Sequence, residues 1–452
     1  MDLKRDAFKA YDIRGKYPEE VNEEMAYRMG RAYVDMFQAR RVAVGHDIRL
    51  SGKDLRNALV LGLTEAGCDV VDIGMCGTEQ IYFATAHLKL DGGIMITASH
   101  NPKEYNGMKL VRQEARPISG DTGLKELEER VIAGQFEPVE GKKFGKVEHA
   151  DIMDAYIEHL LTYIDPSVLK PLKIVVNAGN GAAGPVLDIL EKKLPFKFIK
   201  VNNEPDGNFP NGVPNPILVE NREATASVVR REKADVGIAW DGDFDRCFMF
   251  DEKGAFIEGY YMVGFLAQAF LLKNPGAKII YDPRLVWNTI ELVETEGGVP
   301  VMCKSGHAFI KEKMRKEGAV YGGEMSAHHY FRDFSYCDSG MLPWLLVLEL
   351  ICRADKPLSE LMAERIARYP ISGEVNSTVA DAKAVMEAVE AKYGPSGAVT
   401  KVDGLSVEYP DWRFNLRMSN TEPVIRLNVE ARQDKALLEE KTAELLRLIR
   451  GE

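Results

Sequence analysis

Short apolar runs alternate with longer segments of helical periodicity along most of the chain, and this alternation constrains the fold more than any other feature. The run at residues 41–45 is followed by a helical pattern at 53–66 and by a second apolar run at 69–73. The same pattern begins again at 173–176 and at 277–281. Strands that alternate with helices are typical of α/β domains with largely parallel sheets. The sequence therefore predicts three similar mixed α/β domains, which suggests internal duplication.

A change of pattern near residue 368 indicates a further domain. Beyond it, apolar and polar residues alternate over 424–429, and a charged segment with helical periodicity follows at 434–448. Alternation with a period of two predicts half-buried strands, so we expect a smaller C-terminal α+β domain. The length of 452 residues agrees with three or four domains of roughly 150 residues each. The predicted boundaries enclose residues 1–150, 151–253, 254–368 and 369–452.

The charge balance limits the partners that the chain can bind. Lys and Arg number 58 against 69 Asp and Glu, which gives a net charge of −11. An acidic surface argues against nucleic acid as a partner, although a local basic pocket for one anionic metabolite is compatible with it. Residues 341–352 form the longest apolar run, but they include Pro343 and Glu349 and fall short of the roughly 20 residues of a membrane helix. We expect a buried core helix there and no membrane partner.

The cysteines and the N-terminal residues predict a cytoplasmic protein. Six cysteines are scattered without a close pair spaced for zinc or redox chemistry, as expected of reduced thiols. Residues 1–6 carry charged side chains and are not followed by an apolar core, so we do not expect a signal peptide. The oligomeric state that we expect is a monomer or a homodimer.

Three carboxylates alternate along the segment 241–246, between apolar runs at 236–240 and 247–250. If these carboxylates converge to about 4 Å, each pair repels by roughly 4 kcal/mol, or about 12 kcal/mol for three pairs. A divalent cation removes that cost. Oxygen ligands select a hard cation, and Mg²⁺ usually completes its coordination shell with water or phosphate. The segment therefore predicts a magnesium site that meets a phosphate.

Three other interpretations of this segment remain open at this point. A calcium-binding loop would place Asp241 at its first position, but its sixth position holds Arg246 instead of glycine, and both flanks resemble strands. A hydrolase that forms an aspartyl phosphate would use Asp241 as nucleophile and Asp243 as second acid. A solvated acidic turn is the third interpretation.

A serine follows another apolar strand. The loop at 97–102 comes directly after the apolar run at 93–96, which would place Ser99 at the carboxyl end of a sheet, where open α/β sheets bind ligands. Ser99 could be a nucleophile there. Its neighbour His100 adds little support, because adjacent residues in a strand point in opposite directions. A polar turn that ends at Pro102 is the alternative.

Taken together, the motifs of the chain resemble those of the α-D-phosphohexomutase family. They comprise residues 9–15, 97–102, 241–246, 323–329 and 417–423, and they occur in the order of the family across the whole chain. The resemblance implies a fold of three mixed α/β domains and a smaller C-terminal α+β domain around a central cleft. It also implies an isomerase, a phosphohexomutase, in place of a hydrolase.

The chemistry that the resemblance implies begins with a phosphate on Ser99. Mg²⁺ is bound by Asp241, Asp243 and Asp245, and the phosphorylated Ser99 supplies a further oxygen. A hexose 1,6-bisphosphate is the intermediate and activator, and the phosphate moves between positions 6 and 1 of the sugar. A serine ester suits this cycle because it hydrolyses slowly, whereas an acyl phosphate on aspartate is labile.

The same resemblance assigns roles to other residues. The catalytic set is Ser99, Lys109, Arg14 and His328, with Lys109 as a general base or an electrostatic clamp and His328 as an acid/base or ligand. Contacts to the sugar and its distal phosphate are expected from Tyr11, Arg246, Arg284, His307, Glu324, Ser326, Arg417, Ser419, Asn420 and Thr421. Tyr11 either contacts substrate or anchors its loop. Arg426 lies opposite the apolar face of its strand, and we expect it to be solvated.

The sugar-binding motif indicates specificity. Met325 stands where the glucosamine branch of the family typically has Gln, so the chain resembles the phosphomannomutase and phosphoglucomutase branch. The match at 327–334 favours mannose phosphate, whose product feeds GDP-mannose synthesis. The alternatives are a dual-specific or primary phosphoglucomutase, a phosphoglucosamine mutase, and a phosphosugar phosphatase or binding protein.

Overall fold

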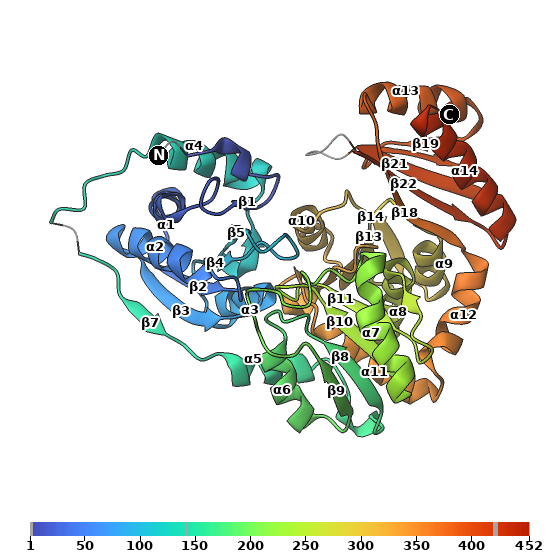
Figure 1. Cartoon of the computed structure of the whole chain (residues 1–452), viewed down its shortest axis with the longest axis horizontal. Coiled ribbons are helices and arrows are strands. Elements are labelled where there is room, and N and C mark those ends of the chain that lie inside the picture. Colours follow the sequence, from blue (N-terminus) through green and yellow to red (C-terminus); the bar gives the residue numbers. More distant parts are fainter. Residues whose placement is uncertain (1–2, 142, 419–423, 452) are drawn as a thin grey trace. The chain divides into compact units, whose positions relative to one another are not determined.

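The chain folds into two compact units in the computed structural model, which describes residues 3–141, 143–418 and 424–451. One unit comprises Met1–Phe256 and His328–Asp355, and the other comprises Ile257–Ala327 and Lys356–Glu452. Figure 1 shows the course of the chain through the helices and strands.

The first sheet of the first unit has seven strands in the order β1-β5-β4-β2-β3-β7, with β6 paired to β5. Strands β4, β2, β3 and β7 run parallel, whereas β5 is antiparallel to β4, β1 and β6. The strands are β1 (Ile13–Lys16), β2 (Arg41–His46), β3 (Asp69–Met75), β4 (Gly92–Ile96), β5 (Tyr105–Arg112), β6 (Arg116–Pro117) and β7 (Val147–His149). The helices are η1 (Arg5–Ala7), α1 (Glu23–Phe37), α2 (Gly52–Glu65), α3 (Thr78–His87), η2 (Gln113–Ala115), η3 (Gly120–Leu124) and α4 (Lys125–Ala133).

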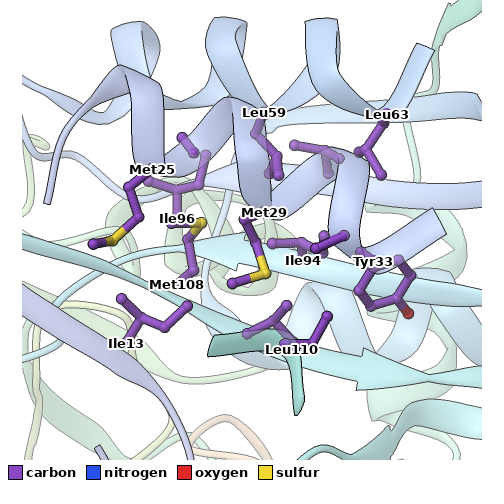
Figure 2. Close-up of a cluster of buried hydrophobic side chains, with 14 of the residues drawn as sticks. Ile13, Met25, Met29, Tyr33, Leu59, Leu63, Ile94, Ile96, Met108 and Leu110 are labelled. Atoms are coloured by element: carbon purple, nitrogen blue, oxygen red, sulfur yellow. The ribbon is translucent and has the colours of Figure 1, made fainter. Parts of the chain in front are cut away.

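Helices α1 and α2 cover one face of this sheet because each has an apolar side. Met25, Met29 and Tyr33 recur at every fourth position of α1, which places them on the same face, and all three are fully buried. Figure 2 shows them with side chains of α2 above residues of β4 and β5. The two helices approach closely at Gly62, where an added Cβ would lie 2.0 Å from the carbonyl oxygen of Tyr27. Glycine is therefore required at that contact.

The second sheet contains the order β11-β10-β8-β9. Strand β8 is parallel to β9 and to β10, and β10 and β11 form an antiparallel hairpin in which Trp240 pairs with Cys247. The strands are β8 (Lys173–Asn177), β9 (Lys197–Val201), β10 (Val236–Trp240) and β11 (Cys247–Phe250), and β12 (Phe256–Ile257) follows them. The helices are α5 (Met153–Leu161), η4 (Pro166–Val168), α6 (Gly184–Lys193) and α7 (Val219–Glu232). The residues that connect the hairpin are therefore the carboxylate segment 241–246.

A later segment of the chain completes the first unit. It contains β16 (His329–Phe331), η5 (Arg332–Phe334), β17 (Cys337–Asp338) and α11 (Leu342–Ala354). Helix α11 is the buried core helix that the apolar run predicted, and its Trp344 packs edge to face against Trp240. Among the residues that the structure describes, no helix is both long and apolar enough to cross a membrane.

The second unit begins with another α/β arrangement. Strand β13 (Lys278–Tyr281) runs parallel to β14 (Val299–Met302) and to β15 (Tyr321–Gly323). The helices of this part are α8 (Gly259–Lys273), α9 (Trp287–Thr295), α10 (His307–Glu317) and α12 (Leu358–Arg368).

The C-terminal part of the second unit is an antiparallel sheet with helices packed on it. The order is β18-β22-β21-β20-β19. The elements are β18 (Ile371–Thr378), α13 (Ala382–Tyr393), η6 (Gly394–Ser396), β19 (Ala398–Thr400), β20 (Leu405–Glu408), β21 (Trp412–Met418), β22 (Val424–Ala431) and α14 (Lys435–Arg450). Residues of α13 and α14 share one apolar core with the sheet, on which both helices lie in Figure 1. The predicted fold class of mixed α/β domains with a C-terminal α+β domain is confirmed, whereas the residue ranges of the four predicted domains stay a prediction.

Candidate active site

The serine loop and the carboxylate loop meet in the first unit. Ser99 follows β4 at the carboxyl end of that strand, and its side chain donates a hydrogen bond from Oγ to Asp241 Oδ2 over 3.0 Å. The two residues are 142 positions apart. Ser99 is buried, and its φ of +50° places it in the left-handed region, where residues other than glycine are uncommon.

The three predicted metal ligands converge. One oxygen each of Asp241, Asp243 and Asp245 lies within 4.8 Å of the others, and all three side chains are buried. Burial raises the pKa of Asp241 to about 6, and the charges of Asp245 and Asp243 add to this effect although Arg246 opposes it. Buried like charges this close need a cation.

Lys109 of β5 supplies part of that positive charge. Its Nζ donates to Asp243 Oδ2 over 2.6 Å and to Asp245 Oδ2 over 2.5 Å. Burial alone would lower the pKa of Lys109, but the two carboxylates outweigh burial and raise it. Burial likewise opposes ionisation of Asp243, yet Lys109 holds the pKa of that carboxyl well below its usual range. These contacts favour the electrostatic clamp over the general base for Lys109.

The remaining oxygens of the carboxylates fit a metal ion. Asp243 Oδ1 and Asp245 Oδ1 are buried and have no hydrogen-bond partner within the described part of the chain. Asp241 lies beside them and contributes a third carboxylate. An all-oxygen donor set with oxygens that lack hydrogens suits a hard divalent cation.

Arg246 and His100 contact each other beside Ser99 and Asp241. Arg246 donates from Nε to Asp241 Oδ2 over 2.8 Å and from Nη2 to His100 Nδ1 over 2.5 Å. Because a guanidinium can only donate, His100 Nδ1 must be the acceptor. Burial and the charge of Arg246 together lower the pKa of His100 well below its ordinary value. Ser99 Oγ lies 3.0 Å from the same nitrogen. Sequence reasoning did not identify His100 as a neutral hydrogen-bond acceptor, because this state of the imidazole depends on the contact with Arg246.

Arg14 of β1 connects the N-terminal motif to the serine loop. It donates from Nε to Asp12 Oδ2 over 2.7 Å and from Nη1 to Asn101 Oδ1 over 2.9 Å. The Arg14 side chain is 21% exposed, so part of the guanidinium can reach solvent or a ligand. Tyr11 is half-buried three positions earlier.

Thr78 and His328 contact the carboxylate loop from two further segments. Thr78, the first residue of α3, donates from Oγ1 to Asp243 Oδ2 over 2.5 Å. His328 Nε2 lies 3.7 Å from Asp245 Oδ1, and Asp338 offers an oxygen within 4.8 Å of both. Sequence reasoning found His328 through its motif. It missed Thr78, for which the only signal is the start of a helix.

The second unit gathers most of the residues that were predicted to bind the sugar. Arg284 is held by both oxygens of Asp282, at 2.8 and 3.0 Å, and its Nη2 lies 3.4 Å from Ser326 Oγ. Glu324 is buried; its Oε1 lies 3.6 Å from Arg284 Nη2 and accepts a hydrogen bond from the amide of Gly306. Asp282 also accepts from the amide of Met325. The loop that carries Glu324 and Ser326 is thus tied to Arg284.

Glu374 joins three arginines of this unit. Its carboxylate lies 3.2 Å from Arg417 Nη2, 3.8 Å from Arg284 Nη1 and 3.4 Å from Arg426 Nη1. Arg426, which was predicted to be solvated, keeps 35% of its side chain exposed, and Glu374 of β18 contacts its guanidinium. His307 begins α10 and is half-buried. Three further predicted contacts, Ser419, Asn420 and Thr421, lie outside the described residues.

A serine hydroxyl bonded to a buried three-carboxylate loop, with Lys109, Arg14 and Arg246 around it, suits an enzyme that transfers phosphoryl groups. The chain belongs to the phosphoglucomutase/phosphomannomutase family. The models of its α/β/α domains I, II and III match residues 5–138, 154–254 and 258–369, and the model of its C-terminal domain matches residues 374–448. The protein is accordingly an isomerase, a phosphohexomutase.

Curated relatives and solved structures match along nearly the whole chain. A protein of Escherichia coli K12 named phosphomannomutase is 59% identical over 448 residues, which are 98% of each chain. Phosphohexose mutases of Xanthomonas campestris are 58% identical over 98% of this chain and 99% of theirs. The crystal structure of a phosphoglucomutase/phosphomannomutase family protein from Burkholderia thailandensis has a TM-score of 0.88 at 35% identity, with 99% and 98% of the chains covered. The Aspergillus fumigatus N-acetylphosphoglucosamine mutase, in complex with GlcNAc-6P and magnesium, shares the fold with a TM-score of 0.62 at 14% identity, with 98% and 95% of the chains covered.

Proposed function

We propose that the protein is a phosphomannomutase, which interconverts mannose 6-phosphate and mannose 1-phosphate through a phosphorylated Ser99 and a 1,6-bisphosphate intermediate. The observation that carries the proposal is the 3.0 Å contact between Ser99 Oγ and Asp241 Oδ2 at the buried carboxylate loop. The name of the Escherichia coli relative supports mannose as the sugar. In this role the protein acts in the cytoplasm, as a monomer or homodimer, and supplies mannose 1-phosphate for GDP-mannose synthesis.

Asp241, Asp243 and Asp245 would hold Mg²⁺, and the phosphorylated Ser99 would offer it a further oxygen. Bound there, the ion would neutralise negative charge on the transferring phosphoryl group. Lys109 keeps Asp243 and Asp245 ionised and ready for the metal, since it already occupies one oxygen of each. The same ammonium is close enough to the loop to attract the phosphoryl oxygens.

The charged groups around Ser99 account for the transfer itself. Phosphoryl transfer is catalysed mainly by in-line positioning and by cations at the transferring group. Arg14 reaches the serine loop through Asn101, and Arg246 reaches Asp241 beside Ser99, so both guanidinium groups border the place of the phosphate. His328, whose Nε2 lies 3.7 Å from Asp245 Oδ1, would exchange a proton with a sugar hydroxyl.

Residues of the second unit are the proposed contacts to the sugar and its distal phosphate. Glu324 and Ser326 offer an acceptor and a hydroxyl to neighbouring hydroxyls of the sugar, and Arg284 fixes their loop. Arg417 presents a planar guanidinium that matches the distal phosphate. His307, Tyr11, Ser419, Asn420 and Thr421 complete the proposed contacts. In the proposed cycle the bisphosphate turns over and presents each phosphate to Ser99 in turn.

Glucose phosphate is the second candidate substrate. The Xanthomonas campestris relatives carry the broader name phosphohexose mutases at nearly the same identity. Mannose and glucose differ in the orientation of one hydroxyl at C2, which one hydrogen bond can accept or reject. A dual-specific mutase would use the same residues.

Coupled turnover tests the proposal. Mannose 1-phosphate and glucose 1-phosphate are offered in turn with Mg²⁺ and a hexose 1,6-bisphosphate primer, and free phosphate is measured in parallel. We expect efficient conversion of the mannose substrate, no release of phosphate, and loss of turnover in Ser99→Ala. Comparable turnover of glucose would make the enzyme dual-specific. Steady release of phosphate, or conversion of neither sugar, would overturn the proposal.

A further inference from the structure

A buried arginine between β2 and α2 binds the backbone of the serine loop. Arg49 Nη2 donates to the carbonyl oxygens of Ser99 and Asn101 over 2.9 and 2.6 Å. Its Nη1 donates to the carbonyl oxygens of Pro102 and Tyr105 over 2.6 and 2.8 Å. The side chain has no exposed surface. A single guanidinium thus spans the loop from the serine to the start of β5.

Asp47 bonds to this arginine and, through Thr97, to the amide of Ser99. Its Oδ1 accepts a hydrogen bond from the amide of Arg49 over 2.9 Å, and its Oδ2 accepts from Thr97 Oγ1 over 2.6 Å. The Thr97 hydroxyl oxygen in turn accepts from the amide of Ser99 over 2.8 Å. The amide of Ser99 is therefore fixed through Thr97 and Asp47, and its carbonyl through Arg49.

These contacts constrain the main chain of Ser99 and do not involve its Oγ. The carbonyl of Ser99 also abuts Gly242 of the carboxylate loop, where an added Cβ would lie 2.6 Å from it. The left-handed backbone of Ser99 is strained and persists only where the surroundings determine it. Burial of the Asp47 and Arg49 charges is a further cost that stability alone does not explain.

We propose that Asp47 and Arg49 are positioning residues for phosphoryl transfer, which hold the main chain of Ser99 so that Oγ meets the phosphoryl group in line at the carboxylate loop. The inference rests on the proposed function, because it concerns the step that Ser99 performs there. A misplacement of about 1 Å at such a centre costs roughly 100-fold in rate.

The test compares variants of two arginines, one at the start of β2 and one in the segment that follows it. Arg49→Lys retains the charge but loses the planar fork, and Arg41→Lys is the control, because Arg41 forms an exposed pair with Glu148. We expect kcat to fall about 100-fold in Arg49→Lys, with a KM for mannose 1-phosphate within about threefold of wild type.

Chemical rescue is a second readout. Added guanidinium ion should raise the activity of Arg49→Ala at least about tenfold and should not raise the activity of Ser99→Ala.

Asp47→Asn and Thr97→Val keep the test decisive if Arg49→Ala does not fold. Both variants should lower the rate at which a hexose 1,6-bisphosphate phosphorylates Ser99. Intact-protein mass spectrometry after rapid quenching measures this rate. Normal kcat in Arg49→Lys and Asp47→Asn, or an effect on KM alone, would overturn the inference. Failure of wild type on every sugar phosphate would instead overturn the proposed function, since the wild-type rate does not depend on the variants.

Discussion

Thr78 donates two hydrogen bonds to Asp243, from Oγ1 to Oδ2 over 2.5 Å and from its amide to the carbonyl oxygen over 3.0 Å. The first residue of α3 therefore orients a carboxylate in the loop between β10 and β11 of the second sheet. Groups that orient metal ligands in this way are worth about 10- to 100-fold in metal affinity.

We predict that Thr78→Val weakens Mg²⁺ binding by about 10- to 100-fold and leaves the fold intact. Isothermal titration calorimetry with Mg²⁺ or Mn²⁺ measures the effect. Thr85→Val is the matched control, because Thr85 is buried on the same helix and its hydroxyl bonds only to the carbonyl of Ile81 among the contacts described. Equal affinities in the two variants would contradict the prediction.

Lys109→Met should destabilise the protein in the absence of metal. The change removes the ammonium from two buried carboxylates, and loss of one partner of a buried ion pair typically costs about 3–5 kcal/mol. Urea unfolding in the presence of a chelator measures the free energy of unfolding. Lys103→Met, an exposed lysine, should stay within about 0.5 kcal/mol of wild type. A Lys109→Met variant as stable as that control would show that the ammonium is dispensable.

Mg²⁺ affinity should fall in acid. Because the metal needs the ionised carboxylate, a proton competes with it at Asp241, whose pKa is raised to about 6 by burial. We expect the apparent affinity to be nearly constant above about pH 7 and to fall about tenfold per unit well below pH 6. Calorimetry at pH 6 in buffers of different ionisation enthalpy should also detect the release of protons on binding. The same affinity at about pH 5 and pH 7.5 would rule out this competition.

Arg417→Lys should weaken substrate binding more than turnover. The lysine keeps the charge but cannot bind the distal phosphate with two parallel hydrogen bonds. Loss of such an interaction costs about 1.5–3 kcal/mol, which corresponds to a rise of about 10- to 100-fold in KM. Arg447→Lys on the exposed side of α14 is the control. If kcat falls while KM stays unchanged, Arg417 acts in the transition state and not in substrate binding.

The sequence was sufficient for the parts of the site that lie in continuous motifs. The preceding apolar strand placed Ser99 at the end of a sheet, and the family resemblance assigned its role; the alternation of the carboxylates between two strands predicted a cation. The contacts between these loops, such as Ser99 with Asp241, required the tertiary structure. The motifs indicated that both belong to one site but not which atoms meet.

Other residues could not be found from the sequence, for different physical reasons. Thr78 and Arg49 act through hydrogen bonds to atoms distant in the chain, which no local pattern encodes. The alternation of β22 correctly placed Arg426 on the polar face. The alternation could not indicate that Glu374 of the neighbouring strand would contact the Arg426 guanidinium.

The hairpin register that pairs Trp240 with Cys247 has a consequence for how this site can vary. All three carboxylates lie on the short connection between these paired residues, so one inserted or deleted residue would redirect several of them together. Because pairing fixes the register of β10 and β11, neither strand can shift by one residue to accommodate such a change. Substitutions one residue at a time can alter the strength of the metal site, whereas a change in loop length would abolish it in a single step.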